Sequence, residues 1–200
     1  MPSKEVVRCF ECPEDIGGRI RSELQLLFQV DVVGLLNPYS RLLLCTALFT
    51  EAYLISDELL NTIKKLWSAG RNPYSAGIYL GRLRKRKPYL IPSTILASAV
   101  FSRLGRYVNS VVVSDSGLKP FLYGRDVLKT SVIKAYPTIV KGSPTFVLGI
   151  DGYVYGVGIA TTNGEDIGRL DESEVVVKNV FDVGWYLRGG TQPKEKKFKV

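Results

Sequence analysis

Histidine is absent from the 200-residue chain, and this absence narrows the chemistry open to the protein. Histidine is the commonest general acid or base, and it orients the nucleophile in most serine and cysteine hydrolases. Hydrolase triads that use histidine are therefore excluded. Catalysis by a lone Asp, Lys or Tyr stays open, but the candidate carboxylates Asp31, Asp57 and Asp115 have no recognisable catalytic surroundings. We expect Asp57 to open a helix and Asp115 to form a turn.

Cysteine is scarce, with only Cys9, Cys12 and Cys45 in the chain. An odd number is unlike the paired cysteines of a small secreted domain. Cys9 and Cys12 have the spacing C-x-x-C, but without histidine the chain cannot supply the four ligands of a closed zinc site. A redox pair of Cys9 with Cys12 and a chance spacing both remain open. We expect no metal and no cofactor.

Long apolar runs are also missing. No run approaches the roughly 20 residues that a membrane-spanning helix needs, and the first residues carry no apolar core of a signal peptide. We therefore expect an intracellular, cytoplasmic protein. The composition, with 46% apolar and 23% charged residues, is that of folded globular proteins.

Positive charge is concentrated in two short segments. The formal net charge is +8, of which residues 82–87 supply five and residues 194–199 supply three, so the rest of the chain is neutral overall. Such clusters favour a polyanionic partner, because neutralised phosphates release their counterions. RNA, DNA and anionic lipid all remain open, as does a basic surface that only keeps the protein soluble.

Local patterns predict alternating helices and strands in the first half. Helices are expected at 13–28, from Ser56 to near Gly70, and from 93 to 104, since apolar residues recur at helical spacing and serines stand at two of the starts. Strands are expected at 41–45, 51–55, 74–84 and 107–114. Alternation along 74–84 would place Arg82, Arg84 and Arg86 on one side of the strand.

The second half reads as β-rich. We expect a turn and a domain boundary at 115–117, a short helix around 127–128, and strands at 145–150, 153–160 and 175–177. Asp151 and Gly152 predict a hairpin with both residues at positive φ. Two glycines inside one strand, Gly156 and Gly158, indicate a bend or a close backbone approach.

Several blocks of residues resemble, in order and spacing, the Nip-seven family of large-subunit ribosome-biogenesis factors. The blocks at 121–124, 127–130, 156–160 and 182–188 are similar to that family's PUA domain, and those at 53–60, 80–83 and 93–96 to its N-terminal domain. The resemblance implies an α+β fold, in which an N-terminal antiparallel α/β domain (1–117) precedes a PUA pseudobarrel (118–190). A flexible lysine-rich tail (191–200) would follow.

The resemblance also implies a function. Members of this family are RNA-binding, non-enzymatic factors that act in pre-rRNA processing and large-subunit assembly. The partners expected here are therefore single-stranded or structured pre-ribosomal RNA and other assembly factors. We expect a monomer in the cytoplasm, or in the nucleolus or nucleus if the source is eukaryotic.

The candidate RNA contacts come from two sources. The family's basic PUA surface corresponds here to Arg169, Lys178 and Arg188, where the acidic neighbours Glu172 and Asp182 dilute the charge. The basic run adds Arg82, Arg84, Lys85, Arg86 and Lys87, with Tyr89 as a candidate stacking ring.

Two other classes of function remain open. PUA domains also occur on RNA-modifying enzymes, so the chain could be a catalytic or accessory subunit of one. It could also be a protein-binding scaffold without direct RNA contact, with Trp185 as a candidate exposed anchor.

Overall fold

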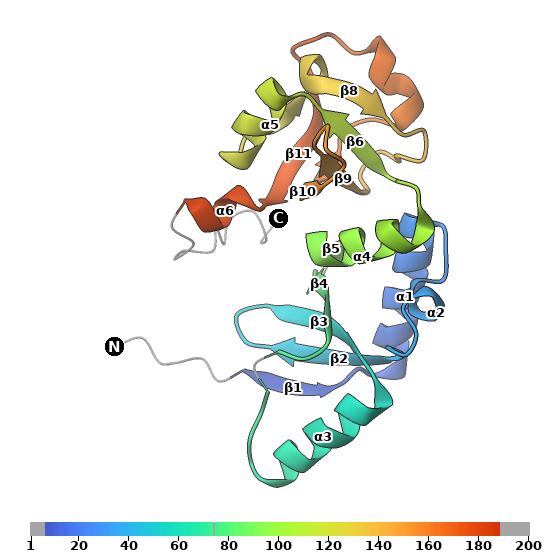
Figure 1. Ribbon diagram of the computed structural model, residues 1–200, viewed down its shortest axis with the longest axis vertical. Coiled ribbons are helices and arrows are strands. Elements are labelled where there is room, and N and C mark those ends of the chain that lie inside the picture. The colour runs from blue at the N-terminus through green and yellow to red at the C-terminus, as the bar shows by residue number, and fades with distance from the viewer. Residues whose placement is uncertain (1–6, 74, 189–200) are drawn as a thin grey trace. The chain divides into compact units, whose positions relative to one another are not determined.

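The structure is a computed structural model that describes residues 7–73 and 75–188 (Figure 1). The chain divides into two compact units, Met1–Arg103 and Leu104–Val200. Each unit has its own sheet, so the predicted α+β class is confirmed. The lysine-rich tail lies outside the described residues.

The first unit is built on a five-stranded antiparallel sheet whose strands follow chain order. The strands are β1 (Arg8–Glu11), β2 (Arg41–Thr46), β3 (Thr50–Ile55), β4 (Ile78–Leu83) and β5 (Leu90–Pro92). The helices are α1 (Glu14–Phe28), α2 (Val32–Leu35), α3 (Asp57–Ser68) and α4 (Thr94–Leu104). The predicted antiparallel N-terminal domain is confirmed.

Helices cover both faces of this sheet, which is why residues 42–45 of β2 are apolar without interruption. Leu43 and Cys45 pack in one cluster with Leu60 and Ile63 of α3. Neighbouring strand residues point to opposite faces, and Leu42 accordingly lies against Gly17 of α1. The α1 and α4 helices contact each other, and Figure 1 shows them on the side of the sheet away from α3.

The limits of α3 follow the local signals in its sequence. The Ser56 hydroxyl oxygen accepts a hydrogen bond from the amide of Leu59 (3.2 Å), as a helix cap does. At the other end Gly70 adopts φ +69°. The amide of Arg71 then donates to the Leu66 carbonyl (2.9 Å) and that of Gly70 to the Trp67 carbonyl (2.9 Å), which is a Schellman motif.

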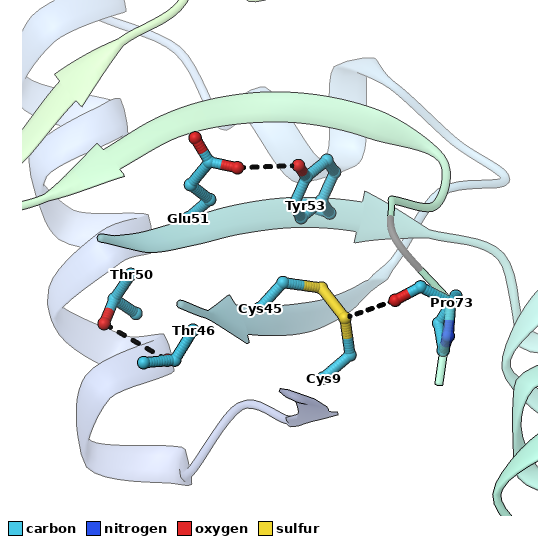
Figure 2. Close-up of a disulfide and its surroundings, with 7 residues drawn as sticks. All are labelled: Cys9, Cys45, Thr46, Thr50, Glu51, Tyr53 and Pro73. Atoms are coloured by element: carbon cyan, nitrogen blue, oxygen red, sulfur yellow. Dashed lines mark hydrogen bonds between the residues drawn. A yellow bond between two sulfur atoms is a disulfide. The ribbon is translucent and has the colours of Figure 1, made fainter. Parts of the chain in front are cut away.

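A disulfide joins Cys9 to Cys45 (Figure 2), so the hypothesis of a Cys9–Cys12 pair is wrong. Cys9 lies directly opposite Cys45 in the β1–β2 register, on the α3 face of the sheet. Cys12 is three residues further along and its sulfur lies instead beside Gly17 of α1. An odd spacing along an extended chain places two side chains on opposite faces, which keeps Cys9 and Cys12 apart.

The second unit contains a six-stranded sheet with the order β7-β11-β10-β9-β6-β8. Its strands are β6 (Ser110–Val113), β7 (Val127–Leu128), β8 (Val132–Ala135), β9 (Pro144–Leu148), β10 (Val154–Ala160) and β11 (Val175–Asp182). The helices are α5 (Asp115–Leu122) and α6 (Gly184–Leu187), with 3-10 turns at Lys129–Ser131 and Gly164–Arg169. Only β6 and β9 pair in parallel among the paired strands described.

This sheet curls around an apolar core to which both of its ends contribute. Val127 from β7, at one end of the strand order, lies in the same cluster as Val111 of β6, and Val132 of β8, at the other end, packs against it. Phe121 of α5 is fully buried there. Strands from both ends of one sheet can share a core only if the sheet is strongly curved, as in the predicted pseudobarrel.

Three expectations for this region are wrong. Residues 115–117 begin α5 and form no turn, because the Ser114 hydroxyl caps the helix by accepting from the Gly117 amide (3.2 Å). Residues 127–128 form strand β7 and no helix. The boundary falls between Arg103 and Leu104 and not at 117, because β6 pairs with β8 and β9 of the second sheet.

The glycines of β10 behave as the sequence indicates. A Cβ on Gly156 would lie 2.6 Å from the Phe121 ring and would also clash with the Phe181 carbonyl. The hairpin before it is confirmed, but only Gly152 has positive φ (+81°). Asp151 instead accepts a hydrogen bond from the Tyr153 amide (3.1 Å), and the Gly149 amide closes the loop on the Tyr153 carbonyl (3.1 Å).

Candidate nucleic-acid interface

The basic run 82–87 is divided between a strand end and a loop. Strand β4 ends at Leu83, and the amide of Arg84 donates to the Tyr89 carbonyl (2.6 Å), which closes a short connection to β5. Lys85, Arg86 and Lys87 lie in that connection and are exposed. The alternation expected for Arg82, Arg84 and Arg86 is therefore wrong, because extended pairing stops before Arg84.

Arg82 is engaged within the protein. Its Nε lies 3.1 Å from Glu51 Oε1, and its guanidinium lies 4.5 Å from the centre of the Phe49 ring. Glu51 also accepts hydrogen bonds from the hydroxyls of Tyr53 (3.0 Å) and Tyr79 (3.4 Å). Burial, together with the Glu51 charge, raises the pKa of the Tyr79 phenol well above its usual range. Arg82 therefore neutralises a half-buried carboxylate.

The β4–β5 loop is anchored to α1 by residues that sequence reasoning missed. The Glu23 carboxylate accepts from the amides of Tyr89 (3.0 Å) and Leu90 (2.9 Å). The Arg19 guanidinium lies 5.9 Å from the centre of the Tyr89 ring. Tyr89 is half-buried, as a residue next to a strand. No local signal in the sequence could reveal this anchor, because more than 60 residues separate its two sides.

In the second unit, Lys178 and Arg169 are exposed while Arg188 is engaged. Lys178 points outward from β11, and Arg169 ends a 3-10 turn with a surface contact to Asp166 (3.1 Å). Arg188 forms two parallel bonds to the Asp182 carboxylate, at 2.9 and 3.1 Å. Asp182 is only 3% exposed, so Arg188 compensates a buried charge.

The PUA-like blocks of the sequence meet at one place in this unit. The Asn179 side-chain amide donates to the Phe121 carbonyl (3.0 Å) and to Asp182 (3.2 Å). A Cβ on Gly184 would clash with the carbonyl of Leu122, so the start of α6 approaches the end of α5. Motif blocks far apart in sequence thus form one junction.

Exposed tyrosines in the second unit are a second feature that sequence reasoning missed. Tyr123 is 73% exposed at the end of α5, and Tyr153 is 71% exposed at the β9–β10 hairpin. Tyr186 is exposed beside Trp185, which is half-buried. Tyr123 and Tyr153 each lie next to a turn glycine with positive φ, and these glycines were the sequence signal that could have indicated the exposed rings. Exposed rings can stack on unpaired bases.

The candidate carboxylates have structural surroundings. Asp31 caps α2 by accepting from the Val33 amide (3.2 Å), and Asp57 opens α3 and contacts Arg41 (2.7 Å). Asp115 is the first residue of α5. Across residues 7–73 and 75–188, no group of three or more His, Cys, Asp or Glu residues could hold a metal ion. Within the same ranges, no helix combines the length and apolar character needed to cross a membrane.

The chain matches one family model and is similar to proteins of known families. The family model described as UPF0113 PUA domain matches residues 109–191. A UPF0113 protein of Archaeoglobus fulgidus is 33% identical over 138 residues, which cover 69% of this chain and 72% of that protein. The 60S ribosome subunit biogenesis protein nip7 of Schizosaccharomyces pombe is 26% identical over 138 residues, covering 69% and 73%.

A solved structure shows the same fold. A conserved PUA domain protein from Thermoplasma acidophilum superposes with a TM-score of 0.57 at 16% identity, over 92% of this chain and 100% of that one. The family model begins inside the second unit, one residue before β6. The resemblance inferred from the motif blocks is confirmed.

Proposed function

Because the chain belongs to the UPF0113 family, whose PUA domain it carries, we propose that it is an RNA-binding, non-enzymatic ribosome assembly factor. It acts in pre-rRNA processing and in the biogenesis of the large ribosomal subunit. The name of its fission-yeast relative, a 60S ribosome subunit biogenesis protein, supports the large subunit as the place of action.

The observation that carries RNA binding is the exposed basic loop between β4 and β5. Lys85, Arg86 and Lys87 are exposed side by side on a loop that the Glu23 carboxylate fixes through two amides. A fixed loop loses little conformational freedom when it binds. Adjacent cations on such a loop suit the regularly spaced phosphates of a nucleic acid.

We assign the candidate residues to two roles. Phosphate contacts are assigned to Arg84, Lys85, Arg86 and Lys87 in the first unit, and to Arg169 and Lys178 in the second. Arg82 and Arg188 are assigned a positioning role, because their guanidinium groups already compensate Glu51 and Asp182. Tyr123 and Tyr153 are candidate stacking rings for unpaired bases, since both are exposed.

The partners follow from the same proposal. The RNA is single-stranded or structured pre-ribosomal RNA, and other assembly factors bind the protein on the same particle. The protein acts as a monomer in the compartment where large subunits are assembled, which is the cytoplasm in cells without a nucleus and the nucleolus in eukaryotes.

The test compares binding of a short single-stranded RNA with binding of a matched duplex DNA, by fluorescence anisotropy at several salt concentrations. We expect tighter, salt-sensitive binding to the RNA. Replacing Lys85 and Arg86 together with glutamine should reduce the salt slope by about 0.7 for each lost phosphate contact. Weakening should be similar for RNAs of different sequence.

The matched control replaces Lys64 and Lys65 of α3 with glutamine, which removes the same charge from another exposed face. This variant should keep the wild-type slope. Equal effects of the two variants would mean that only net charge matters and would reject the loop assignment. No binding to either nucleic acid would reject the RNA-binding proposal and favour a protein-binding scaffold.

A further inference from the structure

The turn between β2 and β3 presents an apolar side chain to solvent. Strand β2 ends at Thr46 and β3 begins at Thr50, and the hydroxyls of these two threonines share a hydrogen bond (3.2 Å, Figure 2). The amide of Ala47 donates to the Phe49 carbonyl (3.1 Å), which closes the turn. At its tip, Leu48 is 46% exposed. A partner that covers an exposed apolar side chain gains binding free energy.

This turn lies at the end of the sheet from which the basic loop between β4 and β5 leaves. In the β3–β4 register, Glu51 lies opposite Arg82. One step further along both strands places Thr50 opposite Leu83, the last residue of β4. Neighbouring strands are about 4.8 Å apart, so the turn and the first residues of the loop are neighbours. A nucleotide chain bound to the loop can therefore extend over the turn.

The ring of the turn is supported by a guanidinium group. The Arg82 guanidinium lies 4.5 Å from the centre of the half-buried Phe49 ring, and its Nε lies 3.1 Å from Glu51 Oε1. The ion pair holds the guanidinium, and the guanidinium in turn restricts the ring. A ring that is held before binding loses little freedom on binding. Because Arg82 also neutralises Glu51, that carboxylate repels an approaching phosphate less strongly.

The combination of charge and apolar surface favours an unpaired nucleotide. Lys85, Arg86 and Lys87 are exposed on the loop and suit phosphates. Leu48 and Phe49 supply the apolar surface on which a base packs. In duplex RNA the faces of the bases are covered by their stacked neighbours, whereas an unpaired nucleotide offers a base face close to its phosphate.

We propose that an unpaired nucleotide of the bound RNA packs its base against Leu48 and Phe49 while its phosphate lies at the basic loop. This inference rests on the proposed RNA binding and names the class of RNA, since the first unit then selects single-stranded segments over duplex RNA. Arg82 is a positioning residue in this site, because it acts through the Phe49 ring.

The test compares binding of the full chain to a short oligouridylate RNA and to an abasic strand of the same length, by fluorescence anisotropy at several salt concentrations. The abasic strand keeps the phosphates and lacks the bases. Phe49→Ala should weaken binding to the RNA about tenfold, as the loss of one base–aromatic contact does. Its salt slope should stay that of the wild type, because no phosphate contact is lost. Its binding to the abasic strand should be unchanged.

A second variant and a matched control complete the test. Leu48→Asn changes an exposed side chain, so it should fold like the wild type, and it should weaken RNA binding about threefold. The control is Phe10→Ala, because Phe10 is 41% exposed in the same unit. Its neighbour Cys9 points to the α3 face of the sheet, so Phe10 points to the opposite face. This control should bind RNA as the wild type does, and an equal loss in Phe10→Ala would contradict the proposal.

Photo-cross-linking locates the base directly. RNA that carries 4-thiouridine should cross-link to residues 47–49, as identified by mass spectrometry of the digested protein. Unchanged RNA affinity in both Phe49→Ala and Leu48→Asn would overturn this inference alone and assign the turn to a protein partner. A parallel loss of affinity for the abasic strand would also overturn it, since no base contact would then be involved. If the wild type bound neither strand, the proposed function would be rejected as well.

Discussion

At the scale of single residues, the chemical state of a side chain in this protein depends on the groups that lie next to it. Cys9 and Cys45 face each other across two strands and form a disulfide, whereas Cys12 stays a thiol. Burial, with Asp15 nearby, raises the pKa of the Cys12 thiol to about 11, so it remains protonated at neutral pH. Cys9 and Cys12, three residues apart, thus have different roles.

Removing the disulfide should lower the free energy of unfolding. The bridge spans 36 residues, and loop-closure entropy for that length gives about 4 kcal/mol. We expect the free energy of unfolding of Cys45→Ala, measured in urea, to be lower than that of the wild type by up to this amount. Added reductant should lower the free energy of unfolding of the wild type but not that of Cys45→Ala. Cys12→Ala is the matched control and should change stability by less than about 1 kcal/mol. Equal losses in both variants would contradict the disulfide.

Arg188→Gln should destabilise the second unit without changing the salt dependence of RNA binding. The variant leaves the buried Asp182 carboxylate without its cationic partner, at a cost of about 3 kcal/mol. Adding Asp182→Asn should recover part of the loss, which a double-mutant cycle measures by urea unfolding. A reduced salt slope in Arg188→Gln would instead make Arg188 a phosphate contact.

At the scale of elements, close approaches decide which strands and helices meet. Strand β10 runs against β11 and α5 at Gly156, where the Phe121 ring and the Phe181 carbonyl occupy the space of a side chain. The β10–β11 register also shifts between Val157 and Gly158, so the strand bends there. Glycine permits the curvature that closes the sheet around its core.

Gly156→Ala should therefore destabilise the second unit by about 2 kcal/mol or more, because backbone and a buried ring cannot move aside easily. Gly168→Ala is the matched control in the same unit, since nothing lies within 4 Å of its added methyl group. It should change the free energy of unfolding by no more than about 0.5 kcal/mol. Similar losses in the two variants would show that packing at Gly156 is not limiting.

At the scale of the whole molecule, the protein consists of two compact units, each with a sheet of its own. The basic loop belongs to the first unit, and the PUA-like junction belongs to the second. Strand β6 decides where the second unit begins, because it lies between β8 and β9. Val111 and Val113 of β6 are fully buried in that core.

A fragment of residues 104–200 should fold alone, whereas a fragment of residues 118–200 should not. The shorter fragment lacks β6, so β9 would lose its parallel partner and the core would lose Val111 and Val113. We expect cooperative thermal unfolding and dispersed amide NMR signals only for the longer fragment. Folding of the shorter fragment would support the boundary at 117.

Much of the fold could be predicted from neighbouring residues alone. Ser56 and Gly70 set the limits of α3, and Gly156 signals the close approach in β10. The predictions for 115–117 and 127–128 are wrong for one reason, because short segments adopt the secondary structure that their tertiary contacts stabilise. Ser114 caps a helix that packs on the core, and Val127 pairs with Val177.

The sequence by itself determined the limits of α1, α3 and α4, the order of the family blocks and the concentration of charge, since these depend on residues close together in the chain. Only the tertiary structure decided the partner of Cys9 and the engagement of Arg82 and Arg188. Sheet register and the packing of α3 bring distant residues together, and no local pattern contains that information.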